Sequence, residues 1–355
     1  MSIFKNYYTK EEWIESKREE TLNLILQEEY GIRPKEVNKP FTYELVEERV
    51  DGNIHISRMN MFYKTNPMEF FIYRKDKNTK KRPTFIQICH PYPFEQGKDF
   101  YNDIDSLYDT VAPVREIIDN GFNLAVLNAG TVAYDKKGGE YSLLFEELKI
   151  ERNDEYFGVL SAWSLGLSKI LDYLYDKDYV DNRYFAAIGH SRGGKTALIT
   201  GAQDERFILS ISNDSGNSGA ALSRGNTGEK IADITRNFPY WFATNYQKYA
   251  NNENALPFDQ HMLIGLIAPR YVSVGSAALD SWADPDGELQ SARFASQYFE
   301  LYGVKGLVAP ENVERNKIYD EGHISYHIRD GHHHITPFDW KQYMHYFQKI
   351  IKENK

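Results

Sequence analysis

The sequence contains a single cysteine, Cys89, among its 355 residues. One thiol cannot form an intrachain disulfide, so nothing in the composition points to an oxidising compartment. The chain also lacks a long apolar run, since no stretch approaches the roughly 18 apolar residues that a membrane-spanning helix needs. Its first residues do not follow the basic-then-apolar plan of a signal peptide. These absences predict a cytoplasmic protein with no membrane partner.

An excess of positive charge is also missing. Lys and Arg number 42 against 51 Asp and Glu, which gives a net charge of −9, and no basic run is interleaved with aromatic residues. The sequence therefore excludes nucleic acid as an expected partner. What is present is a 41% share of hydrophobic residues, enough for a sizeable core, and no segment of low complexity. The oligomeric state is left open.

The N-terminal part has two patterns. Apolar residues spaced among charges over residues 9–30 predict an amphipathic helix. Residues 41–75 alternate between apolar and polar, with a turn signal at Asp51-Gly52, and predict antiparallel strands. We therefore expect a helical extension over residues 1–40, followed by the main domain over residues 41–355.

Short apolar runs without alternation dominate the rest of the chain, as is typical of parallel strands buried on both faces. They cover residues 83–89, 122–128, 184–189, 208–213 and 271–277. Helical patterns separate them over residues 109–121, 156–176 and 291–303, and a strand, a loop and a helix follow over 323–352. Strands alternating with helices predict an α/β fold with a doubly wound, mostly parallel sheet in a single domain.

A serine lies between glycines directly after one of these strands. Residues 189–193 read Gly-His-Ser-Arg-Gly, and a helical pattern follows. In the G-x-S-x-G turn, small residues on both sides expose the serine hydroxyl at the carboxyl edge of the sheet. Ser191 is therefore a candidate nucleophile, with the backbone N–H of Arg192 as a candidate oxyanion donor. The alternative is an ordinary serine in a glycine-rich turn.

A nucleophilic serine needs a base, which in this type of fold follows it late in the chain. His332, His333 and His334 lie after the last predicted strand. A metal site is disfavoured, because consecutive side chains splay apart and no acidic pair stands at helical spacing. We expect one of the three to be the base, and no metal or other cofactor.

Two aspartates are candidates for the acid that orients this base. Asp214 ends the strand that follows the nucleophile helix, and Asp280 follows the next apolar strand. Both lie at the carboxyl edge of the predicted sheet. The residues alone do not separate them.

Six segments carry a more specific signal between about residues 150 and 345. They are "GHSRGGK", "SNDSGNSGAALSR", "NFPYWF", "LPFDQHMLIGLIAPR", "SWADPDGE" and "RDGHHHITPFDW". In this order and spacing they resemble the glucuronoyl esterases of carbohydrate esterase family 15, the 4-O-methyl-glucuronoyl methylesterase-like group. The resemblance implies an α/β-hydrolase fold and a serine carboxylic-ester hydrolase that acts on a glucuronate ester. It does not extend to the 89–104 loop, so the second oxyanion donor and the role of this loop are left open.

The resemblance also implies roles for individual residues. The nucleophile falls on Ser191, the base on His333 and the acid on Asp214, with Asp280 as the less favoured acid. An oxyanion role falls on Arg192, and contacts to the sugar fall on three further residues: Lys195, Glu229 and Trp282.

The cations beside the serine fit this interpretation. Arg192 and Lys195 lie in the first helical turn, where each positive charge costs a few tenths to about 1 kcal/mol against the helix dipole. They can direct charge at an oxyanion and at sugar oxygens, or simply pair with nearby carboxylates. The expected substrate is a small-molecule or oligosaccharide ester. The alternatives are a deacetylase of O-acetylated sugars with the same triad and a non-catalytic binding protein.

Overall fold

A ten-stranded sheet forms the centre of the protein in a computed structural model, which describes residues 4–5, 8–77, 80–89, 104–107, 112–149 and 153–354. The strand order is β1-β2-β3-β5-β4-β6-β7-β8-β10-β9. The strands are β1 (Thr42–Asp51), β2 (Ile54–Phe62), β3 (Pro67–Lys75), β4 (Arg82–Cys89), β5 (Asn123–Asn128), β6 (Val180–His190), β7 (Phe207–Asn213), β8 (Tyr271–Ala277), β9 (Lys317–Tyr319) and β10 (Ile324–Arg329).

The directions of the strands confirm the two predicted patterns. β1, β2 and β3 pair antiparallel, as their alternating residues indicated. The five apolar runs form the neighbouring parallel strands β5, β4, β6, β7 and β8, and the strand expected within residues 323–352 pairs parallel with β8 as β10. The sequence did not predict β9, an antiparallel edge strand of three residues, because so short a strand leaves no periodic pattern.

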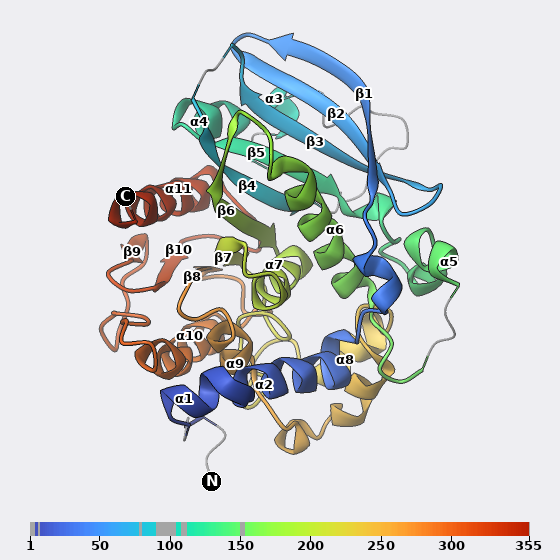
Figure 1. Ribbon diagram of the computed structural model, residues 1–355. Helices are drawn as coiled ribbons and strands as arrows, with labels where there is room; N and C mark the ends of the chain where they lie inside the picture. Colours follow the sequence, from blue (N-terminus) through green and yellow to red (C-terminus); the bar gives the residue numbers. More distant parts are fainter. Residues whose placement is uncertain are drawn as a thin grey trace.

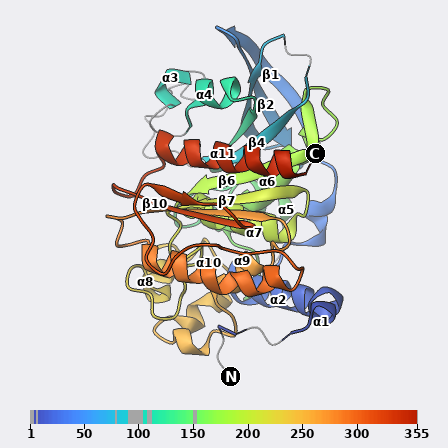
Figure 2. The same cartoon turned by 90° about the vertical axis from the view of Figure 1, so that its left-hand side faces the viewer.

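Helices cover both faces of this sheet (Figures 1 and 2). On one face, α4 (Val114–Asp119) and α11 (Pro337–Glu353) lie over one apolar core, together with the short α3 (Ile104–Leu107). On the other, α6 (Val159–Leu174), α7 (Arg192–Gln203), α9 (Gln260–Gly265) and α10 (Pro285–Glu300) bury a larger core. The short α5 (Leu144–Leu148) and α8 (Ile231–Asn237) lie in connecting segments. This three-layer, doubly wound arrangement confirms the predicted α/β-hydrolase fold.

The N-terminal helical pattern is also confirmed. Residues 10–30 form a continuous helical segment, in which α1 (Lys10–Glu12) and α2 (Arg18–Ile25) alternate with π-helical turns. It crosses the lower part of the molecule in Figure 1. Its residues Trp13 and Tyr30 are fully buried in the larger core, so the segment is packed onto the sheet domain. The division at residue 40 stays a prediction.

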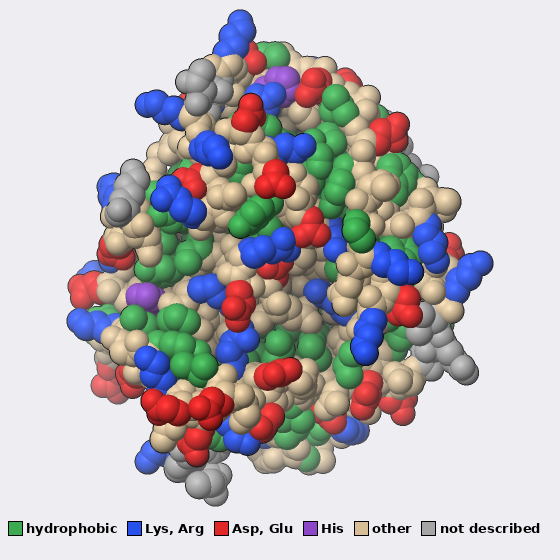
Figure 3. All heavy atoms as spheres, viewed as in Figure 1, with side chains coloured by type: hydrophobic (Ala, Val, Ile, Leu, Met, Phe, Trp, Pro, Cys, Tyr) green, Lys and Arg blue, Asp and Glu red, His purple; other side chains and the backbone are tan. Residues whose placement is uncertain are grey.

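Charged side chains of both signs are interspersed over the face in Figure 3. This agrees with the mixed charges of the sequence. Among the residues that the structure describes, no helix is both long enough and apolar enough to cross a bilayer.

Candidate active site

Ser191 lies in a sharp turn between β6 and α7. Its backbone has φ 56° and ψ −125°, a strained conformation for a residue with a side chain. The turn is fixed on both sides, since Ser191 N donates to Asn213 O at 2.8 Å and Gly194 N donates to Ser191 O at 2.8 Å. A Cβ atom on Gly189 would overlap the backbone of Gly193, so this approach of strand and helix requires glycine. The predicted nucleophile turn is present.

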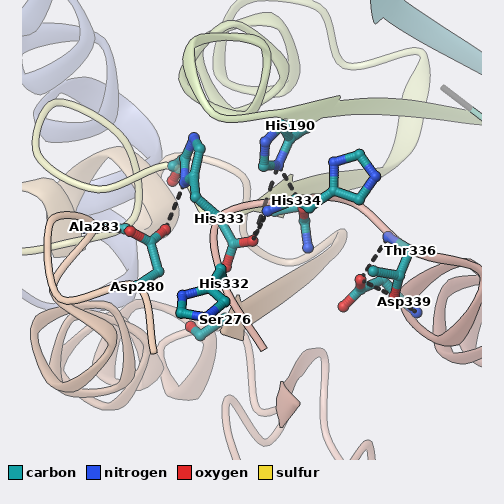
Figure 4. Close-up of polar contacts among 12 residues, drawn as sticks. His190, Ser276, Asp280, Ala283, His332, His333, His334, Thr336 and Asp339 are labelled. Carbon is teal, nitrogen blue, oxygen red and sulfur yellow. Dashed lines mark hydrogen bonds and ion pairs between the residues drawn. The ribbon is translucent and has the colours of Figure 1, made fainter. Parts of the chain in front are cut away.

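His333 lies opposite this turn, in the loop between β10 and α11. Its Nδ1 is 2.5 Å from Oδ2 of Asp280, and its ring centroid is 4.5 Å from that of His190, the residue before Ser191. Figure 4 shows the ring of His333 directed at Asp280, whereas the rings of His332 and His334 point elsewhere. His333 is therefore the one of the three that combines an acidic partner with a place beside the serine turn.

This hydrogen bond reverses the expected preference between the two candidate acids. The resemblance favoured Asp214 as the partner of the base, but the partner of His333 is Asp280. Asp214 Oδ2 instead accepts from Arg329 Nη2 at 3.3 Å and from the backbone N–H of His334 at 3.4 Å. Burial, reinforced by the neighbouring Glu288 carboxylate, raises the pKa of Asp214 well above its ordinary value. Asp214 is thus engaged by other donors.

Arg329 was not identified from the sequence as a functional residue. It ends β10, it is 4% exposed, and its guanidinium bonds to Asp339 Oδ2 at 2.8 Å as well as to Asp214. The signal was in the sequence, because an arginine at the end of a strand lies three residues before the first of the three histidines.

Glu288 on α10 was missed as well. It is fully buried, and its Oε1 accepts the backbone N–H groups of Ser215 at 2.8 Å and Gly216 at 3.0 Å, just after Asp214. Its Oε2 accepts from Ser276 Oγ at 2.6 Å. Burial raises the pKa of Glu288 to about 7. Glu288 therefore holds the loop that carries Asp214.

Arg192 pairs with a carboxylate that the sequence did not single out. Its Nη1 bonds to Asp135, which also accepts from Trp241 Nε1 at 2.8 Å and from Tyr240 Oη at 3.2 Å. The guanidinium carbon lies 4.7 Å from the centre of the Trp241 ring. Its Nε is buried and has no hydrogen-bond partner among the described residues. Arg192 is thus held rigidly beside Ser191 with one donor unused.

Lys195 is buried in the first turn of α7, four residues after Ser191. Its Nζ donates to the carbonyl oxygens of Ser215 at 2.6 Å and Asn217 at 2.5 Å, and Glu229 Oε2 lies at 3.5 Å. Burial lowers the pKa of Lys195, and Glu229 opposes this shift. Arg192 and Lys195, the two cations of the first helical turn, therefore each have a carboxylate partner. This is the alternative in which they pair with nearby carboxylates.

Trp282 and Glu229 lie on joined loops. Glu229 N donates to Trp282 O at 2.9 Å, and Trp282 is 53% exposed at the surface. Trp282 can therefore contact a ligand directly, and Glu229, which is 6% exposed, is paired with Lys195. Most of the 89–104 loop, with any oxyanion donor in it, lies outside the described residues.

Asp214, Asp280 and His333 offer ligand atoms within 4.8 Å of one another, a spacing that a metal ion can use. The Arg329 guanidinium beside Asp214 opposes the binding of another cation there. The arrangement fits a nucleophile, base and acid better than a metal centre.

Comparison with known proteins identifies similar esterases. The family described as "Glucuronyl esterase, fungi" matches residues 114–303, more than half of the chain. A carbohydrate esterase from an unknown prokaryotic organism is 39% identical over 234 residues, or 65% of this chain and 54% of that protein. A 4-O-methyl-glucuronoyl methylesterase from Podospora anserina is 31% identical over 48% of this chain and 36% of that protein. The chain thus spans about half or less of these relatives.

Solved structures extend the likeness to nearly the whole fold. A glucuronoyl esterase from Solibacter usitatus superposes with a TM-score of 0.87 at 30% identity, over 97% of this chain and 94% of the other. A promiscuous family 15 esterase from a marine bacterial metagenome gives 0.83 at 29% identity, over 97% and 94%. A Sporotrichum thermophile glucuronoyl esterase mutant in complex with methyl 4-O-methyl-β-D-glucopyranuronate gives 0.64 at 22% identity, over 98% and 86%. This last likeness concerns the fold alone.

The matched segment contains Ser191, Asp214 and Asp280, and the solved relative that is 30% identical covers almost all of the chain. The chain belongs to the glucuronyl esterase family.

Proposed function

We propose that this protein hydrolyses esters of glucuronic acid through an acyl-enzyme on Ser191. The observation that carries the proposal is the hydrogen bond between His333 Nδ1 and Asp280, which lies opposite the strained turn of Ser191 in a chain of this family. Because an ionised Asp280 can only accept, it holds the proton of a neutral His333 on Nδ1 and leaves Nε2 free as a base.

Acylation follows from this arrangement. His333 takes the proton of the Ser191 hydroxyl as the serine oxygen attacks the ester carbonyl. The backbone N–H of Arg192 and its guanidinium stabilise the oxyanion. Asp135 and the Trp241 ring keep the guanidinium in place as negative charge develops.

The second half of the reaction reverses these roles. His333 donates its proton to the leaving alcohol, and the glucuronoyl group stays on Ser191 as an ester. His333 then takes a proton from water, which attacks the acyl carbonyl, and returns it to Ser191 as glucuronic acid leaves.

The substrate class is supported by the relatives. Several are named 4-O-methyl-glucuronoyl methylesterases, and one solved structure contains a methyl glucuronate ester. In this chain, we assign contacts with the uronate ring to the exposed face of Trp282 and to the Lys195–Glu229 pair. Lys195 donates to two carbonyl oxygens, so we expect its contact with Glu229, the longest of the three at 3.5 Å, to yield first to a sugar hydroxyl.

Hydrolysis by purified protein tests the proposal. The wild type and Ser191→Ala are compared on methyl and benzyl glucuronate esters and on acetylated xylobiose. We expect the wild type to cleave the glucuronate esters, and the variant to lose about 10⁶-fold in kcat. Preferential release of acetate would instead indicate a sugar deacetylase with the same triad.

A fluorophosphonate probe separates the remaining alternative. We expect it to label Ser191 of the wild type and to leave the alanine variant unlabelled. Folded wild-type protein that neither labels nor cleaves any ester would indicate a non-catalytic binding protein. The cytoplasmic location stays a prediction.

A further inference from the structure

Arg329 contacts several parts of the active site, although the resemblance assigns it no role. It is the last residue of β10, and its side chain is 5% exposed. Its guanidinium donates to the carbonyl oxygens of His332 (2.8 Å) and His334, the two neighbours of His333. One planar group thus holds the backbone on both sides of His333.

The guanidinium itself is anchored from the opposite direction. Nε donates to Asp339 Oδ2 at 2.8 Å, and Asp339 is fixed in turn by the N–H and hydroxyl of Thr336 and by His327. Nη2 also reaches Asp214 Oδ2 at 3.3 Å. Because both carboxylates are buried, this pairing is screened little by water.

The backbone is adapted to this guanidinium. Gly331 has a φ of 127°, and a Cβ atom there would collide with Nη1 of Arg329. A residue with a side chain at this position would displace the guanidinium or the loop. The backbone conformation requires glycine here, and the absence of a side chain leaves room for the Arg329 guanidinium.

The same segment also sets the position of the acid. Ala278 N donates to Arg329 O and Leu279 N donates to Gly331 O, each at 2.9 Å, directly before Asp280. The loops that carry Asp280 and His333 are thus joined at Arg329 and Gly331. A shift of this junction changes the 2.5 Å contact between His333 Nδ1 and Asp280.

We infer that Arg329 is a positioning residue for the base, which acts through the backbone of His332 and His334 to hold His333 against Asp280. Asp214 serves as a buried counter-ion of Arg329 in this arrangement. The inference rests on the proposed function, because it assigns His333 as the base. It requires the fork of the guanidinium, since the single ammonium of a lysine cannot span two carbonyl oxygens and two carboxylates.

Arg329→Met and Arg329→Lys test this inference. We expect kcat to fall about 10- to 100-fold in both variants, with KM changed much less, because a displaced base slows the chemical step. The lysine variant keeps the positive charge between Asp214 and Asp339, so it serves if the methionine variant does not fold.

Arg270→Met is the matched control. Arg270 precedes β8 at the opposite edge of the sheet, and it too donates to backbone carbonyl oxygens, of Phe207 and Gly201, at 2.7 Å each. This variant loses the same kind of contact away from the site. We expect it to lower the melting temperature while kcat stays within about twofold of the wild type.

The tautomer of His333 provides a readout that a merely structural role would not change. Long-range ¹H–¹⁵N NMR correlations of the ring, assigned with a His333→Gln variant, report which nitrogen carries the proton. We expect the Nδ1–H form to dominate in the wild type and Arg270→Met, and a mixture in Arg329→Lys. An unchanged tautomer, or a kcat within about twofold of the wild type in Arg329→Lys, would overturn the inference.

Labelling of Ser191 keeps the two proposals separable. The rate of fluorophosphonate labelling depends on the base but not on a sugar. If the wild type labels without cleaving glucuronate esters, the substrate proposal fails. Slower labelling in Arg329→Lys would then still support the positioning role, and an equal rate would contradict it.

Discussion

Asp214 and Asp280 follow neighbouring parallel strands, β7 and β8, and both are buried at the same edge of the sheet. One carboxylate meets the imidazole of His333, and the other meets the guanidinium of Arg329 and the backbone of the histidine loop. The two carboxylates therefore share the same position at the edge of the sheet. The donors that face each carboxylate decide which of them acts on the base.

The surroundings of the two carboxylates differ accordingly. Asp214 has one oxygen, Oδ1, without a hydrogen-bond partner among the described residues, and burial beside Glu288 raises its pKa. Asp280 contacts a histidine whose side chain is 43% exposed to solvent. Asp214 faces a buried guanidinium, whereas Asp280 faces the imidazole that the acid of a triad must stabilise during turnover.

Asp280→Asn should have the largest effect on this comparison. We expect kcat/KM for a glucuronate ester to fall by about 10³- to 10⁴-fold, because an amide no longer holds the His333 proton on Nδ1. Steady-state kinetics measure the loss, and circular dichroism checks the fold. A loss of less than about tenfold would break the assignment of Asp280 as the acid.

Asp214→Asn should cost much less activity. We expect kcat/KM to stay within about tenfold of the wild type, or about 1.4 kcal/mol in the barrier. The variant should also unfold at lower urea concentration, since Arg329 loses a charged partner. A loss of activity equal to that of Asp280→Asn would show that the base uses both carboxylates.

Glu288→Gln tests the environment of Asp214 through the pH dependence of the free energy of unfolding. The pKa of Glu288 is about 7 in the folded chain against an ordinary value of 4.5, so the folded state keeps a proton that the unfolded chain loses. This group therefore lowers the free energy of unfolding as pH rises through that window, by up to about 1.4 kcal/mol per unit. We expect Glu288→Gln to gain stability relative to the wild type between pH 5 and 8.

Urea unfolding at several pH values measures this difference. Glu311→Gln is the control, because Glu311 is exposed and should leave the pH dependence unchanged. A constant difference between Glu288→Gln and the wild type across this range would contradict the raised pKa.

The sequence predicted the features that depend on local pattern. Apolar runs indicated the parallel strands, and the glycines around Ser191 indicated the sharp turn that the structure contains. The choice between Asp214 and Asp280 depends on Arg329, which lies 115 residues from Asp214 in the chain. The pairing of Arg192 with Asp135 spans 57 residues. Such contacts arise from the packing of distant loops and leave no periodic signal.

The tautomer of His333 in Asp280→Asn and Asp214→Asn tests the central claim most directly. Ring ¹H–¹⁵N correlations should show the Nδ1–H form in the wild type and in Asp214→Asn, and its loss in Asp280→Asn. The opposite result, with the Nδ1–H form lost in Asp214→Asn and kept in Asp280→Asn, would contradict the pairing of His333 with Asp280.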